Sequence, residues 1–161
     1  MRPGLLLRRA LLSDVPALAA LEAACFTHPW TPAQVHEEVV RVPPDTVLVL
    51  EGPASPGGAP AGIRAYCSFS LVVDEMHVMN VAVDPRFRRQ GLARRLLAFA
   101  MARAARAGAR RALLELRAGN REALALYESL GFERLGLRRG YYGEPTEDAL
   151  VLARELCGTE S

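Results

Sequence analysis

The residues best suited to chemistry stand in one run from Asn80 to Leu97. It reads as an apolar strand, a turn marked by Pro85, and a basic stretch (Arg88-Arg89-Gln90-Gly91-Leu92-Ala93) that enters an amphipathic helix. A helix start carries unpaired N–H groups and a partial positive charge. Because Gly91 and Ala93 keep the backbone bare, the amides there can converge on phosphate oxygens. The run therefore predicts an anion site of a kind that suits a pyrophosphate.

Taken alone, the same stretch has a structural interpretation. One glycine in a tight strand-to-helix turn, beside solvated arginines, explains residues 88–93 equally well. A dinucleotide fingerprint needs three glycines directly after a parallel strand, and a P-loop needs Gly-Lys-Ser/Thr. Neither pattern occurs here. A second, independent segment is needed to decide between the two interpretations.

That second segment runs from Leu114 to Phe132 and joins a short apolar strand to a helix. Asn120 is placed to cap the helix. Glu115 in the strand is a carboxylate that can accept a proton, and Tyr127 on the helix is a phenol that can donate one. An ion pair with a nearby arginine is the structural alternative for Glu115, and a place in the core is the alternative for Tyr127.

Together the two segments resemble the GNAT superfamily of N-acetyltransferases. Arg88-x-x-Gly91-x-Ala93 matches its acetyl-CoA pyrophosphate loop, and Asn120 with residues 125–132 matches its second cofactor segment. Shorter motifs resemble the RimI group of that superfamily: His28-Pro29-Trp30, Asn80 to Pro85, Leu114 to Arg117, Arg138 to Tyr142, and Glu147-Asp148-Ala149. The resemblance spans nearly the whole chain, and it implies acetylation of the N-terminal alanine of a small-subunit ribosomal protein.

Two positions depart from the RimI pattern. Gly140 stands where the group usually has Asn, and His28 stands where an aromatic or small residue is common. Both belong to segments that the resemblance assigns to the acceptor peptide. The departures therefore concern the preference for a peptide and not the binding of the donor.

The resemblance also implies roles for individual residues. An amine would attack the thioester of acetyl-CoA directly, with Glu115 as general base and Tyr127 as general acid. The implied cofactor-binding residues are Val81, Ala82, Val83, Arg88, Arg89, Gln90, Gly91, Leu92, Ala93 and Asn120, and the implied substrate-binding residues are Trp30, Tyr141 and Tyr142. For Trp30, hydrophobic anchoring of a loop is the alternative.

Simple acid–base chemistry is consistent with an N-terminal acceptor. A free α-amino group has a pKa of about 8, against about 10.4 for lysine, so neutralising it at pH 7 costs roughly 3 kcal/mol less. We therefore expect an acetyl-CoA-dependent Nα-acetyltransferase. The alternatives are an acetyltransferase for lysine or small amines, and a non-catalytic acyl-CoA-binding module that needs neither Glu115 nor Tyr127.

The elements that position these residues can be read from periodicity, caps and turn residues. We expect strands at 5–10, 46–50, 63–73, 75–83, 112–116, 132–137 and 149–156, and helices at 13–25, 32–40, 91–107 and 120–130 with N-caps at Ser13, Thr31 and Asn120. Residues 52–61 read as a loop. The order mixes hairpins with crossover helices, which predicts an α/β GNAT fold: a mixed, mostly antiparallel central sheet flanked by helices on both faces.

Composition and charge limit the number of domains and the kinds of partner that we expect. The 161 residues are 50% hydrophobic and 24% charged, which predicts one N-acetyltransferase domain over 1–161. A net charge of +2 does not call for a nucleic-acid partner. The three cysteines and three histidines lack metal-ligand spacing, so we expect reduced thiols and no metal. With no signal-like start and no apolar run of about 20 residues, we expect a cytoplasmic protein without a membrane partner.

Overall fold

The computed structural model describes residues 4–41, 46–54, 61–143 and 146–156. The chain divides into two compact units: unit 1 comprises Met1–Phe69 with Met79–Ala100, and unit 2 comprises Ser70–Val78 with Met101–Ser161. Strands β3 (Gly62–Val72) and β4 (Glu75–Val83) and helix α3 (Leu92–Arg106) each contribute residues to both units. The expectation of one domain over 1–161 stays a prediction.

The predicted order of strands and helices is confirmed. The remaining elements are β1 (Leu6–Arg9), α1 (Val15–Cys25), α2 (Pro32–Val39), β2 (Val47–Gly52), β5 (Arg111–Arg117), α4 (Arg121–Ser129), β6 (Glu133–Gly143) and β7 (Thr146–Glu155). The strands form one sheet in the order β1-β2-β3-β4-β5-β7-β6. The β4–β5 pair is parallel, whereas β1–β2, β2–β3, β5–β7 and β6–β7 are antiparallel, so the expected mixed sheet is also confirmed.

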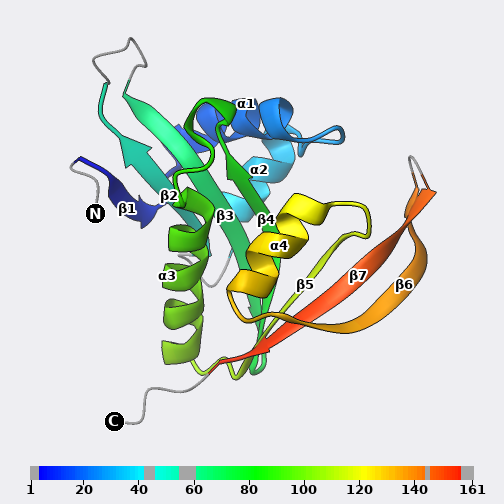
Figure 1. Ribbon diagram of the computed structural model, residues 1–161. Coiled ribbons are helices and arrows are strands. Elements are labelled where there is room, and N and C mark those ends of the chain that lie inside the picture. Colours follow the sequence, from blue (N-terminus) through cyan, green and yellow to red (C-terminus); the bar gives the residue numbers. More distant parts are fainter. Residues whose placement is uncertain (1–3, 42–45, 55–60, 144–145, 157–161) are drawn as a thin grey trace. The chain divides into compact units, whose positions relative to one another are not determined.

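Unit 1 is a layered structure around β1 to β4. Helices α1 and α2 lie on one face of these strands and the first part of α3 lies on the other (Figure 1). In β2, Val47 and Val49 pack against α1 and α2 in a buried cluster. Because side chains alternate along a strand, Leu48 and Leu50 point to the opposite face, where both are fully buried.

The predicted N-cap of α2 is found at Thr31, whereas α1 begins later than predicted. The Thr31 hydroxyl accepts from the Gln34 N–H at 3.2 Å, and the Gln34 side chain accepts from the Thr31 N–H at 2.9 Å. The expected cap at Ser13 is wrong, because residues 12–14 form a short 3-10 turn and α1 begins at Val15. The Asp14 carboxylate causes the difference, since it binds Arg8 at 2.7 Å and the Leu11 N–H.

Unit 2 is built on the start of β4 and on β5, β7 and β6, with α4 on one face (Figure 1). Ala112, Leu114 and Leu116 of β5 are buried, so Glu115 and Arg117 share the opposite face of that strand. The β6–β7 hairpin is longer than the strands predicted at 132–137 and 149–156. Backbone hydrogen bonds continue the hairpin through exposed arginines and the tyrosines Tyr141 and Tyr142, where a hydrophobic pattern gives no signal.

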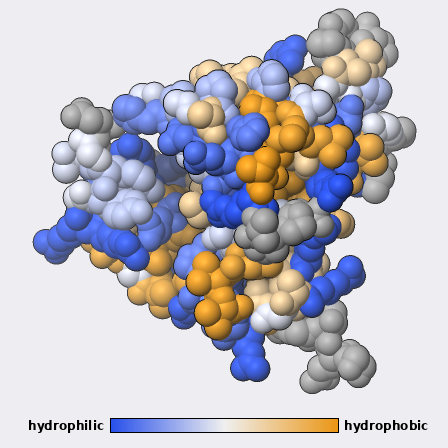
Figure 2. Space-filling model, turned by 180° about the vertical axis from the view of Figure 1, so that it is seen from behind, coloured by the Kyte–Doolittle hydropathy of each residue, from blue (hydrophilic) through white to orange (hydrophobic). Residues whose placement is uncertain are grey.

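The surface is mixed in character. Seen from behind, hydrophobic residues form small patches separated by hydrophilic residues (Figure 2). Exposed hydrophobic side chains of the described residues include Leu6, Leu11 and Leu12 in unit 1 and Leu135 and Leu137 on β6. Among the helices that the structure describes, none has the length and apolar character needed to cross a bilayer.

Candidate active site

The predicted anion loop lies in unit 1, immediately before α3. Arg89 has a φ of +61° and Gly91 a φ of +76°, so left-handed residues alternate along the loop. Such alternation turns successive N–H groups toward one side and forms a concave site for an anion. The loop leads into a helix of 15 residues, whose N-terminus adds a partial positive charge. Both features are ones that anion sites use, and phosphate binding at this loop stays a prediction.

The turn before this loop is held by a network around Asp84. The Asp84 carboxylate accepts from the Arg86 N–H at 2.9 Å and pairs with the Arg86 guanidinium at the same distance. The hydrogen bond from Arg86 lowers the pKa of Asp84. The Arg64 guanidinium lies 4.2 Å from the centre of the Phe87 ring, and the Arg64 carbonyl accepts from the Asp84 N–H. These contacts fix the end of β4 to β3.

The strand residues assigned to the cofactor lie at the end of β4. The Ala82 side chain is buried in the core of unit 1, while Val81 and Val83 are partly exposed. The Val83 carbonyl accepts from the Cys25 thiol at 3.3 Å and from Arg88 Nε at 3.4 Å. Because the side chains of Ala82 and Leu92 are buried, these two residues would contact a ligand through their backbone.

A buried carboxylate that could not be predicted from the sequence binds this strand from α1. The Glu22 side chain of α1 is 1% exposed. It accepts from the Trp30 N–H at 3.1 Å, from Asn80 Nδ2 at 2.6 Å and from the Tyr66 hydroxyl. Burial, followed by the hydrogen bond to Glu22, raises the pKa of Tyr66. The only available signal was a glutamate within the apolar stripe of 15–25.

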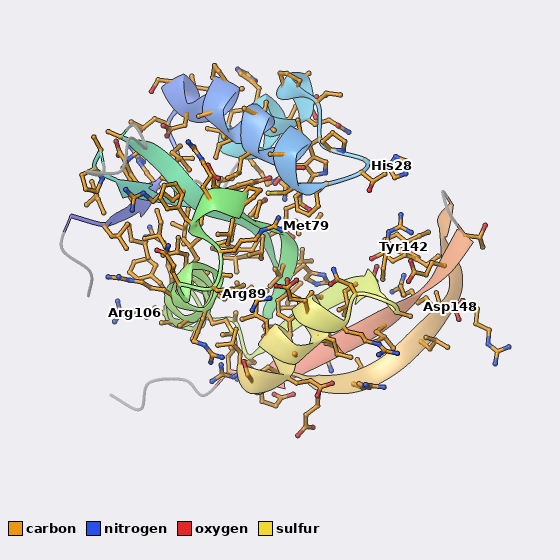
Figure 3. All side chains as sticks on the ribbon, turned by 45° about the horizontal axis from the view of Figure 1, so that its top comes forward. His28, Met79, Arg89, Arg106, Tyr142 and Asp148 are labelled. Atoms are coloured by element: carbon orange, nitrogen blue, oxygen red, sulfur yellow. The ribbon has the colours of Figure 1, made fainter. Side chains whose placement is uncertain are left out.

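Trp30 is anchored by this network. Its backbone binds Glu22, and its side chain packs, partly buried, against the core cluster of unit 1. The anchoring interpretation is therefore found in the structure, and the contact of Trp30 with a substrate stays a prediction. His28 lies in the same segment, at the tip of the connection between α1 and α2 (Figure 3).

In unit 2, Glu115 is the centre of a cluster formed with Arg117, Arg138, Tyr141 and Tyr142, which we call the Glu115 cluster. Glu115 Oε1 lies 3.2 Å from Arg138 Nη2. The hydrogen bond between Tyr141 and Glu115 raises the pKa of the tyrosine. The structural alternative for Glu115, an ion pair with arginine, is thus present. It leaves the role of general base as a proposal.

The other side of the Glu115 cluster is held by Arg117. Its guanidinium carbon lies 4.3 Å from the centre of the Tyr142 ring, and its Nη1 lies 3.5 Å from Glu147. Glu147 also accepts from the Gly119 N–H at 2.7 Å. The Tyr141 and Tyr142 rings meet edge to face with centres 5.1 Å apart. Burial raises the pKa of Tyr142, and the charge of Glu115 adds to the effect.

A bulge in β6 shapes this cluster. Arg138 pairs with Ala149 and Tyr142 with Glu147, so three residues of β6 stand opposite Asp148 alone. Gly140 in the bulge has a φ of +61°, and its N–H donates to Asp148 Oδ1 at 2.8 Å (Figure 3 labels Tyr142 and Asp148). Glycine and asparagine tolerate this left-handed conformation best. The exchange of the usual Asn for Gly140 therefore preserves the backbone.

Tyr127 lies on α4, and Asn120 is the residue immediately before that helix. Asn120 Oδ1 accepts from the Ala123 N–H at 3.1 Å, which confirms the predicted N-cap. The Tyr127 ring is edge to face with Phe132, at 5.7 Å between centres, and is partly buried. Gly131 follows the helix with a φ of +89°, as a left-handed C-terminal residue should. The catalytic and cofactor roles of Asn120 and Tyr127 stay predictions.

The described cysteines and histidines lie outside the Glu115 cluster. Cys67 is buried, and burial raises its pKa to about 12, which keeps it a thiol at neutral pH. Within the described ranges, no three side chains of His, Cys, Asp or Glu gather as metal ligands would. Cys157 and most of the predicted loop at 52–61 lie outside the described residues.

The chain and its fold are similar to those of known acetyltransferases. A family model described as Acetyltransferase (GNAT) family matches residues 15–132, and the chain belongs to this family. It is 35% identical over 145 residues to the [ribosomal protein bS18]-alanine N-acetyltransferase of Escherichia coli strain K12, covering 88% of this chain and 90% of that protein. It is 36% identical to the N-alpha-acetyltransferase RimI of Mycobacterium tuberculosis, with coverage of 89% and 87%.

Solved structures agree with the sequence relatives. A crystal structure of a ribosomal-protein-alanine N-acetyltransferase from Escherichia coli superposes with a TM-score of 0.81 at 30% identity. The match covers 98% of each chain. The predicted GNAT fold, the enzyme class and the likeness to the RimI group are therefore confirmed.

The loop before α3 supports a direct test. Alanine at position 91 has space for its Cβ, but the φ of +76° costs an alanine about 1 to 2 kcal/mol. We expect Gly91→Ala to raise the KM for acetyl-CoA about threefold to tenfold, measured by initial rates. Gly136→Ala on β6 is the control, because its Cβ also meets open space but its backbone is not left-handed. If Gly91→Ala lowered the Tm but left the KM for acetyl-CoA unchanged, the loop would be a structural turn and not a donor site.

Proposed function

We propose that this acetyltransferase transfers the acetyl group of acetyl-CoA to the α-amine of a protein N-terminus, and that its acceptor is the N-terminal alanine of a small-subunit ribosomal protein. The relatives named for that activity support the acceptor, since they match most of the chain. The observation that carries the chemistry is Glu115, a partly exposed carboxylate among the tyrosines and arginines of β5 and β6.

The donor is assigned to unit 1 and to Asn120. In this proposal the N–H groups of residues 88–93 bind the pyrophosphate, and Arg88 and Arg89 add charge. Val81, Ala82 and Val83 bind the pantetheine arm and the acetyl group through their backbone, and Asn120 contacts the donor beyond the reacting centre. The two left-handed residues of the loop and the helix start behind it support this assignment.

Two side chains handle the protons of the reaction. Glu115 accepts the proton that the amine loses as the C–N bond forms, directly or through a water molecule. Tyr127 donates a hydrogen bond or proton to the departing thiolate as the C–S bond breaks. A phenol has a pKa of about 10 and a thiol about 8.5, so the phenol suits a hydrogen bond to the thiolate and the thiol is the stable product.

The acceptor peptide is assigned to Trp30, Tyr141 and Tyr142. The two tyrosines are neighbours on β6, and Glu147 and Asp148 of β7 add negative charge beside them. That charge attracts the cationic N-terminus of a peptide. Because the proposed acceptor is a ribosomal protein, we propose that the reaction takes place in the cytoplasm. We also propose that it needs no metal and no contact with a membrane or nucleic acid.

Acetyl transfer to a panel of short peptides tests the function. The peptides differ in their first residue, and each carries one internal lysine, so that product mass analysis separates α-amine from side-chain acetylation. We expect acetylation at the α-amine, with the highest kcat/KM for alanine at the first position. A peptide blocked at its N-terminus serves as the control and should stay unmodified.

Other outcomes identify the alternatives. Acetylation of the blocked peptide on its lysine would indicate a lysine acetyltransferase. Tight binding of acetyl-CoA without turnover of any N-terminal peptide would contradict the proposal and favour a non-catalytic acyl-CoA-binding module.

A further inference from the structure

We infer that Arg138 is a positioning residue that keeps the bound acceptor amine uncharged, because its guanidinium is already paired with the Glu115 carboxylate, to which an ammonium would otherwise bind. The inference rests on the proposed function, in which Glu115 receives the proton of the amine. The proposed mechanism gives Arg138 no role. In this inference Arg138 controls whether the bound acceptor amine carries a proton.

The contacts of Arg138 carry the inference. Its Nη2 lies 3.2 Å from Glu115 Oε1, and its guanidinium carbon lies 5.5 Å from the centre of the Tyr141 ring. The Arg138 side chain is 58% exposed and that of Glu115 is 26% exposed. The ion pair is therefore open to solvent on the arginine side, where a ligand has access to it.

The bulge in β6 places two groups of that strand beside Glu115. In a regular strand, residues three apart point to opposite faces, so Arg138 and Tyr141 could not both contact one side chain of β5. Residues 139–141 bulge opposite Asp148, and both Arg138 and Tyr141 then interact with Glu115. The Gly140 N–H, held by Asp148, fixes this irregularity.

Other charged groups near the pair have their own partners. Arg117 of β5 pairs with Glu147 of β7 and stacks on Tyr142. Asp148 of β7 accepts from the Gly140 N–H. Arg138 of β6 pairs directly with the Glu115 carboxylate.

A guanidinium beside the carboxylate disfavours a second cation there. An α-amine with a pKa of about 8 loses its proton readily next to Arg138, and only the neutral amine has the lone pair that attacks. Without Arg138, the ammonium would form a stable ion pair with Glu115. That pair stabilises the ground state and not the transition state, so it lowers KM and kcat together and leaves kcat/KM nearly unchanged.

Steady-state kinetics of Arg138→Gln with an alanine-initiated peptide test the inference. At pH 7 and low salt, we expect kcat and the KM for the peptide each to fall about threefold to tenfold. The rising limb of the kcat profile should move up by about half to one pH unit, whereas the limb of kcat/KM, which reports the free peptide, should stay in place. High salt should reduce these differences, and Arg138→Lys should restore wild-type values.

Arg134→Gln is the matched control. Arg134 lies on the same strand, is 61% exposed and pairs with Glu128 at 3.6 Å, so the variant removes the same charge away from Glu115. We expect wild-type kinetics from it. A fall of kcat/KM in Arg138→Gln with an unmoved kcat profile would indicate a merely structural role and overturn the inference, as would unchanged kinetics. A wild-type enzyme inactive on every N-terminal peptide would instead remove the proposed function, and the inference with it.

Discussion

Replacing Glu115 with glutamine is expected to lower kcat for an N-terminal peptide by about a hundredfold to ten-thousandfold. Glutamine keeps the size of the side chain and an oxygen for Arg138 and Tyr141, but it cannot accept the proton of the amine. The KM for acetyl-CoA should stay within about twofold, because the donor is assigned to other residues. Initial rates with saturating acetyl-CoA measure both quantities.

The control for this variant is Glu133→Gln. Glu133 is an exposed carboxylate at the start of β6, and its replacement makes the same change of charge in the same unit. We expect it to leave kcat unchanged. If Glu115→Gln retained more than half of the wild-type kcat, Glu115 would not be the general base, and its ion pair with Arg138 would be its whole role.

Replacing Glu22 with alanine is expected to lower the free energy of unfolding by about 3 to 5 kcal/mol. The variant leaves the Trp30 N–H, the Asn80 amide and the Tyr66 hydroxyl without their buried acceptor. It also opens a cavity beside side chains that are almost completely buried. Urea unfolding followed by circular dichroism measures the change as a lower midpoint with a similar m value.

Two variants define the origin of that loss. Glu37→Ala on α2 removes an exposed carboxylate from the same unit and should change the free energy of unfolding by less than about 0.5 kcal/mol. Glu22→Gln keeps an acceptor oxygen and should cost less than Glu22→Ala. A loss below about 1 kcal/mol in Glu22→Ala would show that the three donors find other partners and that the network does not stabilise unit 1.

The two networks differ in how they relate to the site residues. Glu22 joins α1 to β3, to β4 and to the segment that carries Trp30, so it supports the residues assigned to the acceptor and the donor in unit 1. Arg138 acts on the carboxylate assigned to the chemistry in unit 2. The expected effects differ accordingly: stability changes with Glu22, and the relation between kcat and KM changes with Arg138.

Much of the fold could be predicted from local sequence. Thr31 and Asn120 were identified as caps because an N-cap side chain binds backbone only a few residues away. The buried face of α3 follows from its periodicity, and Leu92, Leu96 and Leu97 are all at most 4% exposed. The end of β6 could not be predicted in this way, since its continuation past Leu137 depends on pairing with β7.

In the candidate site, too, local features could be predicted and long-range contacts could not. The sequence by itself determined the turn at 88–93, because a glycine before a helix is a local feature. It also supplied the residue types of Glu115 and Tyr127, a carboxylate and a phenol. Only the tertiary structure decided what the carboxylates contact. Glu22 meets Asn80 across 58 positions of sequence, and Glu115 of β5 meets Arg138 of β6 because both strands pair with β7. Such contacts depend on strand pairing and helix packing, and no pattern of neighbouring residues encodes them.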